Sequence, residues 1–322
     1  MISAVLLLLL GFLLLIFGGN WFVDGAADIA RKYRVPELLI GATIVSVGTT
    51  LPEVLVSTEA AAMGHGELAY GNAIGSIICN TAFISALSVT IKPTSFEKKS
   101  LLIPSLFFFA AAVFYAANSY IFGYFSRLSG IILLLIFAAY MFFNIKNAVN
   151  DSVAAKREDS ASGGEINVIK AIIMLVAGAA AIAFGSDLLV ENGTIIAKRL
   201  GVPESVIGLT FIALGTSLPE LVTAITSLIK GHSALSLGNI IGANFFNLVL
   251  VSGLSITVSP FEVPANKQIA GINSSLLIDI PLMFIVMLII TVPTMISGKT
   301  RRSQGIMLLL LYCAFCTLQF IL

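Results

Sequence analysis

One long stretch of this chain occurs twice. Residues 41–80 read GATIVSVGTTLPEVLVSTEAAAMGHGELAYGNAIGSIICN, and residues 208–247 read GLTFIALGTSLPELVTAITSLIKGHSALSLGNIIGANFFN. The copies align 167 positions apart without a gap, which pairs Glu53 with Glu220. Between Pro36 and Pro93, 23 of 58 positions are identical in the second copy. Such a repeat indicates two equivalent halves, and any fold for this chain has to accommodate both.

The composition is that of a membrane protein. Hydrophobic residues make up 58% of the chain and charged residues 11%, whereas soluble domains carry about 25% charged residues. The net charge of +1 gives no strongly basic character of the kind that attracts nucleic acid. At about 20–25 residues per membrane helix, the apolar runs predict an all-α polytopic protein with ten transmembrane helices. We expect them at residues 2–28, 37–62, 68–90, 101–118, 127–147, 168–196, 204–229, 235–257, 270–292 and 303–321.

The predicted helices divide into two sets of five. Residues 150–167 are the only linker-like polar segment, so we expect a first repeat over 1–149 and a second over 168–322. An odd number of helices makes the second half enter the bilayer from the opposite side, which is an inverted-topology repeat.

The distribution of basic residues predicts the orientation of the chain. With the N-terminus outside, 14 of the 18 Lys and Arg residues fall in inner loops. The four in outer loops are Arg127, Lys198, Arg199 and Lys267. The positive-inside rule then places both termini outside the cell membrane and the linker in the cytosol.

Each copy carries one Glu inside an apolar run. Glu53 and Glu220 end the sequence Gly-Thr-Thr/Ser-Leu-Pro-Glu of their copies. A carboxylate near the bilayer centre is costly and marks an ion or proton path. The Pro removes a backbone donor and the Gly permits local unwinding, so we predict broken helices 2 and 7, the first near residues 48–52. Freed carbonyls, hydroxyls and carboxylates form a set of hard oxygen ligands for Ca²⁺ or Na⁺.

The charge of this site predicts an exchange of cations. Inverted symmetry brings the two Glu residues together at the midplane, where they carry a charge of −2 when ionised. One Ca²⁺ or two Na⁺ neutralise that charge, and a third Na⁺ leaves the loaded protein net positive. A site that binds either Ca²⁺ or Na⁺, but not both at once, is the physical basis of antiport. The competing interpretation is a pair of kinking prolines beside structural Glu residues.

Helices 3 and 8 carry a second repeated motif, Gly-Asn-x-Ile-Gly-Ser/Ala, at 71–76 and 238–243. We interpret its glycines as close-packing positions for membrane helices. Asn80 and Asn247 follow Ser76 and Ala243 by about one turn. Their amide oxygens are either neutral cation ligands or partners in ordinary interhelical hydrogen bonds.

At these two paired motifs the sequence resembles the Na⁺/Ca²⁺ exchanger branch of the cation/Ca²⁺ antiporter superfamily, and most of all its short archaeal members. The resemblance covers nearly the whole chain. It implies that helices 2, 3, 7 and 8 surround the ions, that helices 1 and 6 slide against this core, and that three Na⁺ exchange for one Ca²⁺. It also implies no cofactor beside the transported ions, no nucleic-acid partner, and a monomer that functions in a lipid bilayer.

The resemblance also implies roles for single residues. Glu53 and Glu220 would be the central ligands, Thr49 and Thr216 would supply carbonyls and further oxygens, and Ser46 and Ala213 would supply carbonyls. Further ligands would be the hydroxyls of Thr50, Ser217 and Ser76, with Asn80 and Asn247 flanking the centre. Two positions depart from the family pattern, because relatives often have Ser at Ala243 and some have Asp at Asn247.

Three other functions remain to be weighed. H⁺/Ca²⁺ antiport, in which both Glu residues protonate, is the alternative within transport. An intramembrane zinc protease would need His-Glu-x-x-His, but His65 and His232 both fall in predicted turns, so we expect no enzyme. An ion channel would give single-channel currents in place of saturating, counter-ion-dependent flux.

Overall fold

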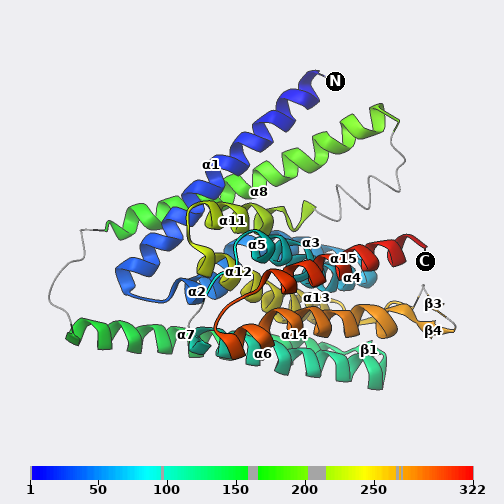
Figure 1. Ribbon diagram of the computed structural model, residues 1–322. Coiled ribbons are helices and arrows are strands. Elements are labelled where there is room, and N and C mark those ends of the chain that lie inside the picture. The colour runs from blue at the N-terminus through cyan, green and yellow to red at the C-terminus, as the bar shows by residue number, and fades with distance from the viewer. Residues whose placement is uncertain are drawn as a thin grey trace.

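The chain folds into a bundle of helices (Figure 1). The computed structural model describes residues 2–95, 98–158, 166–201, 215–265, 268–269 and 271–321. The helices are α1 (Ile2–Tyr33), α2 (Glu37–Ile40), α3 (Ser46–Ala62), α4 (Gly66–Cys79), α5 (Ala86–Ile91), α6 (Lys98–Ala117), α7 (Arg127–Glu158), α8 (Val168–Arg199), α11 (Leu218–Ile229), α12 (Ser233–Phe246), α13 (Ser252–Val258), α14 (Ile280–Ser297) and α15 (Arg302–Ile321).

Short π-helical segments and strands complete the described part of the chain. The π-helical segments are η1 (Gly41–Val45), η2 (Asn80–Ser85), η3 (Asn118–Phe122), η5 (Asn247–Val251) and η6 (Ser275–Asp279). Strand β1 (Tyr124–Phe125) pairs antiparallel with β2 (Phe261–Glu262), and β3 (Gln268–Ile269) pairs antiparallel with β4 (Ile272–Asn273).

The helices lie in three groups. In Figure 1, α1 and α8 cover one side of the bundle and α6, α7 and α14 the other, with α3, α4, α11 and α12 between them. Within α12 every residue from Leu235 to Phe246 is buried. The Phe245 ring packs 4.5 Å, centroid to centroid, from that of Tyr140 on α7. Helix α12 is therefore at the centre of the molecule.

Eight helical segments of the described chain are long and apolar enough to cross a membrane. They are Ile2–Tyr33, Glu37–Ala62, Gly66–Ile91, Ser100–Phe122, Arg127–Asn144, Val168–Arg199, Ser233–Val258 and Ser275–Ser297. Helix α11 is apolar but shorter, and residues 204–214 of the predicted seventh helix lie outside the described residues. The chain is a multi-pass membrane protein, and the count of ten spans stays a prediction.

The repeated sequence adopts the same local structure twice. Helices α4 and α12 begin and end 167 residues apart, and each is followed by a π-helical segment that starts at Asn80 or Asn247. The turns before them also agree, because Gly64 has a φ of 84° and Gly231 a φ of 86°. The two halves thus repeat each other's local structure from these turns through the π-helical segments.

Helices α1 and α8 pack antiparallel through glycines. Gly11 lies against Gly185 and Gly18 against Gly178, so the residue numbers rise along one helix as they fall along the other. The repeat makes Gly11 equivalent to Gly178 and Gly18 equivalent to Gly185. The two contacts are therefore the same contact made once from each half, as in a two-fold interface.

The first copy is not broken at residues 48–52, contrary to our expectation. Segments α2, η1 and α3 form one continuous helix, with Pro52 inside α3. A broken helix would leave open backbone inside the membrane, which is costly, whereas a proline in a continuous helix loses only one hydrogen bond. The Phe22 ring also packs against Gly48. The irregularity lies upstream in η1, where Ser46 Oγ donates to the Gly41 carbonyl at 2.7 Å and Tyr140 Oη donates to the Ala42 carbonyl at 2.8 Å.

The second copy does have an interruption next to its Glu. Residues 216–217 form a turn, and α11 begins at Leu218 with Pro219 in its first turn. A proline in the first turn loses no helical hydrogen bond, because the first N–H groups of a helix have no partner in it. Glu220 is therefore in the first turn of α11, whereas Glu53 is in the middle of α3.

The glycine contact between α1 and α8 leads to a prediction about stability. A Cβ added at Gly178 would lie 2.5 Å from the Phe22 amide nitrogen and 2.8 Å from the Gly18 carbonyl oxygen. Because both are backbone atoms, we expect Gly178→Ala to push the helices apart and to destabilise the protein by about 1–3 kcal/mol. Thermal unfolding in detergent measures this. Ala180→Val, at an exposed position of α8, is the control and should leave the midpoint unchanged; equal midpoints for both variants would contradict the close contact.

Candidate cation-binding site

Glu53 and Glu220 are fully buried carboxylates from equivalent positions of the two halves. Each is 0% exposed, and the helices that carry them, α3 and α11, contact each other. Within the described residues, none of their four oxygens has a hydrogen-bond partner, and no described salt bridge includes either residue. A buried charge without a partner costs several kcal/mol. The pair therefore requires compensation by a cation or by protons.

Neutral hydroxyls surround this pair. The Glu220 carboxylate faces the hydroxyls of Thr49 and Thr50. Thr50 Oγ1 and Ser217 Oγ are buried without a hydrogen-bond partner in the described residues. Thr49 precedes Glu53 by one helical turn and so lies on the same face of α3. The carboxylates and hydroxyls together offer hard oxygen atoms of the kind that Ca²⁺ binds.

Asn80 and Asn247 are at the first positions of η2 and η5. Both side chains are 0% exposed, and neither the oxygen nor the nitrogen of either amide has a hydrogen-bond partner among the described residues. The described structure thus contains no ordinary interhelical hydrogen bond for these amides. π-helical turns inside α-helices occur frequently at functional sites.

The other predicted residues have different surroundings. Ser46 uses its hydroxyl to donate to the backbone carbonyls of Gly41 at 2.7 Å and Asn239 at 2.9 Å. Ser76 is buried on α4, one turn before Asn80. Thr216 lies in the turn before α11. Ala213 lies outside the described residues.

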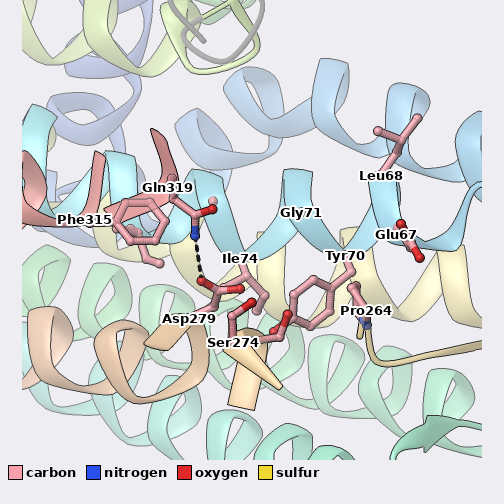
Figure 2. Close-up of a pocket in the computed structure, with 13 residues that line it drawn as sticks. Glu67, Leu68, Tyr70, Gly71, Ile74, Pro264, Ser274, Asp279, Phe315 and Gln319 are labelled. Atoms are coloured by element: carbon pink, nitrogen blue, oxygen red, sulfur yellow. Dashed lines mark hydrogen bonds between the residues drawn. The ribbon is translucent and has the colours of Figure 1, made fainter. Parts of the chain in front are cut away.

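The large cavity of the molecule is elsewhere. Its volume is about 490 Å³ and it follows the face of α4 that carries Gly71 and Gly75. Figure 2 shows Tyr70, Asp279 and Gln319 at this cavity, with Gln319 donating to Asp279 at 3.2 Å. Glu53 and Glu220 do not line it. The two buried carboxylates therefore do not belong to this cavity.

Comparison with known proteins identifies the family. The family model described as sodium/calcium exchanger protein matches residues 3–146 and 170–321. The chain belongs to the sodium/calcium exchanger family. Our prediction from the paired motifs is thereby confirmed, and the family is one of transporters.

Relatives of the exchanger span its whole length. The sodium/calcium exchanger MaX1 of Methanosarcina acetivorans is 30% identical, with 98% of each chain covered. The membrane protein MJ0091 of Methanocaldococcus jannaschii is 33% identical, with 94% of each chain covered. Among solved structures, the sodium-calcium exchanger NCX_Mj soaked with 100 mM Na⁺ and 10 mM Sr²⁺ matches at a TM-score of 0.80 and 30% identity, with 97% of each chain covered.

Two asparagines of the exchanger were missed by our reading of the sequence. Asn239 accepts a hydrogen bond from Thr49 Oγ1 at 3.1 Å, and Asn72 accepts one from Thr216 Oγ1 at 3.2 Å. Both lie in the Gly-Asn-x-Ile-Gly motif, which we assigned to packing. Packing is confirmed for Gly238, whose added Cβ would lie 2.1 Å from the Leu38 carbonyl oxygen, but the prediction is wrong for Gly71 and Gly75, where an added Cβ would meet nothing within 4 Å. The signal that could have found the asparagines is their identity in both copies.

The unpaired carboxylates lead to a second prediction. We expect Glu53→Gln and Glu220→Gln each to raise the unfolding midpoint in cation-free buffer, because removing an uncompensated buried charge is worth about 1–4 kcal/mol. Both variants should also lose the stabilisation that added Ca²⁺ gives the unsubstituted exchanger.

The control for this experiment is on the same helix. Glu59 is exposed on α3, and Glu59→Gln should leave both the midpoint and its response to Ca²⁺ unchanged. Ca²⁺-dependent stabilisation that survives in either buried variant would contradict the site.

Proposed function

We propose that the exchanger moves Ca²⁺ out of the cell in return for Na⁺ by alternating access, with Glu53 and Glu220 binding either ion in competition. The observation that carries the proposal is the pair of fully buried carboxylates whose oxygens have no hydrogen-bond partner in the described residues. The family of the chain, and a relative that is named a sodium/calcium exchanger, support the choice of ions.

The charge of the site explains why the two ions exclude each other. Two ionised carboxylates are neutralised by one Ca²⁺, and the same oxygens are the ligands that Na⁺ would need. Loading both would place uncompensated positive charge in a low-dielectric interior, which is costly. We propose three Na⁺ per Ca²⁺, so that each cycle moves one net positive charge across the membrane.

The proposed ligands extend outward from the two carboxylates. Thr49 and Thr216 would supply carbonyl and hydroxyl oxygens, Thr50 and Ser217 hydroxyls, and Ser46 and Ala213 carbonyls. Ser76, Asn80 and Asn247 would complete the flanking Na⁺ positions. The burial of Asn80 and Asn247 without hydrogen-bond partners in the described residues supports this role.

We propose that the two halves are inverted repeats of five helices each, over residues 1–149 and 168–322. The antiparallel, reciprocal glycine contacts of α1 with α8 support this arrangement. We further propose that these two helices slide together against the core. Helix α7 ends at Glu158, inside the proposed cytosolic linker 150–167. We place both termini outside the cell membrane and propose that a monomer is sufficient.

The function is tested by transport into inverted membrane vesicles. We expect Ca²⁺ uptake that depends on a Na⁺ gradient with pH clamped on both sides, and that responds to membrane potential because net charge moves. Uptake driven by a pH gradient, with no stimulation by Na⁺, would indicate H⁺/Ca²⁺ antiport instead.

One departure from the family pattern gives a further prediction about Na⁺. Ala243 is fully buried and occupies the position in the second half that Ser76 has in the first. We expect Ala243→Ser to add an oxygen ligand and to lower the Na⁺ concentration for half-maximal exchange. Ser76→Ala is the matched opposite and should raise it. If neither substitution changes the dependence on Na⁺, these positions are not Na⁺ sites.

A further inference from the structure

Two hydrogen bonds link the proposed ligand-bearing turns of one half to a helix of the other half. Thr49 Oγ1 donates to Asn239 Oδ1 at 3.1 Å, which joins α3 to α12. Thr216 Oγ1 donates to Asn72 Oδ1 at 3.2 Å, which joins the turn before α11 to α4. Thr49 lies 167 positions before Thr216, and Asn72 lies 167 positions before Asn239. The contact is therefore made twice, with the roles of the halves exchanged.

The bond of Thr49 departs from what threonines do elsewhere in these helices. A buried helical threonine usually donates to the carbonyl four residues earlier. Within the described chain this bond is made at 2.6–2.8 Å by Thr43, Thr81, Thr257, Thr291 and Thr294. Thr49 instead directs its proton across to the other half. Four other buried threonine hydroxyls of these helices have no partner in the described residues, so what distinguishes Thr49 is its bond to the other half, made one turn before Glu53.

The direction of this proton decides whether the hydroxyl can bind a cation. A hydroxyl oxygen has two lone pairs and one proton, and it offers a lone pair to a cation only if the proton points elsewhere. For Thr49 the proton goes to the amide oxygen of Asn239, which is not one of the proposed ligands. Thr49 lies one helical turn before Glu53 on α3, so its lone pairs are available beside the proposed site.

The orientation of each asparagine is itself fixed by a serine of α3. Ser46 Oγ reaches Asn239 Oδ1 at 3.3 Å, and Asn72 Nδ2 donates to Ser57 Oγ at 2.8 Å. The equivalent positions in the second half hold alanines, Ala213 and Ala224. One helix thus anchors both asparagines, although the asparagines belong to different halves.

We propose that Asn72 and Asn239 are positioning residues, which set the hydroxyl orientation of Thr216 and Thr49 and thereby the affinity of the exchanger for its cations. The inference rests on the proposed function, because it takes both threonines as ligands. The asparagines act through the threonines. Groups that orient metal ligands change affinity by roughly 10–100-fold when they are removed.

The test is a double-substitution cycle read by Ca²⁺ binding. Thr49→Val removes the donor and keeps the shape of the side chain, and Asn239→Ala removes the acceptor. For each single variant we expect the Ca²⁺ concentration that gives half-maximal thermal stabilisation of the purified exchanger to rise roughly tenfold. The double variant should bind Ca²⁺ no more weakly than the weaker-binding single variant, because the two substitutions remove the same hydrogen bond. Thr49→Ser keeps the donor and should restore binding.

A buried asparagine on the same helix is the control. Asn244 is 0% exposed on α12 and donates to Thr81 Oγ1 at 2.6 Å. Asn244→Ala should lower the unfolding midpoint and leave the Ca²⁺ dependence unchanged. If Asn239→Ala behaves in the same way, or if the effects of Thr49→Val and Asn239→Ala multiply in the double variant, the inference is wrong.

The binding measurement separates this inference from the proposed function. Absence of Na⁺-driven Ca²⁺ uptake by the unsubstituted exchanger would overturn the proposed function, while the cycle would still report on the asparagines. Absence of any Ca²⁺-dependent stabilisation of the unsubstituted exchanger would overturn both.

Discussion

Two carboxylates buried in one membrane bundle are stable as charges only when something positive joins them. No described basic side chain pairs with Glu53 or Glu220, so the charge is left for a cation or for protons to compensate. The surrounding groups follow from that constraint. They are neutral hydroxyls and amides, which offer oxygen atoms without adding charge. A fixed Lys or Arg here would neutralise the pair permanently and remove the reason for a cation to enter.

The repeat determines where these neutral groups come from. The Glu, Thr and Asn residues of the proposed site occur in pairs 167 residues apart, and the backbone of α4 and η2 is reproduced in α12 and η5. The side chains are less symmetric than the backbone. Ser46, Ser57 and Ser76 correspond to Ala213, Ala224 and Ala243. The first half thus keeps hydroxyls that the second half has lost, and the two flanks of the central pair differ chemically.

The sequence predicted the family and the burial of the two Glu residues better than the path of the backbone. The pairing of Glu53 with Glu220, their burial and the family all followed from two repeated motifs. The predicted break at residues 48–52 was wrong, because local rules for proline say nothing about the helices that pack around it. Asn72 and Asn239 were overlooked for a related reason. Their partners are 144 and 190 residues away, and only the packing of the two halves brings them together.

The same distance in sequence gives these bonds their significance. Because Thr49 and its acceptor belong to different halves, the orientation of the hydroxyl depends on how the halves are placed relative to each other. Both bonds join helices of the central group, α3 to α12 and the turn before α11 to α4. In the proposed mechanism α1 and α8 slide against this group, so the two bonds would hold the proposed ligands in one geometry while the outer helices move.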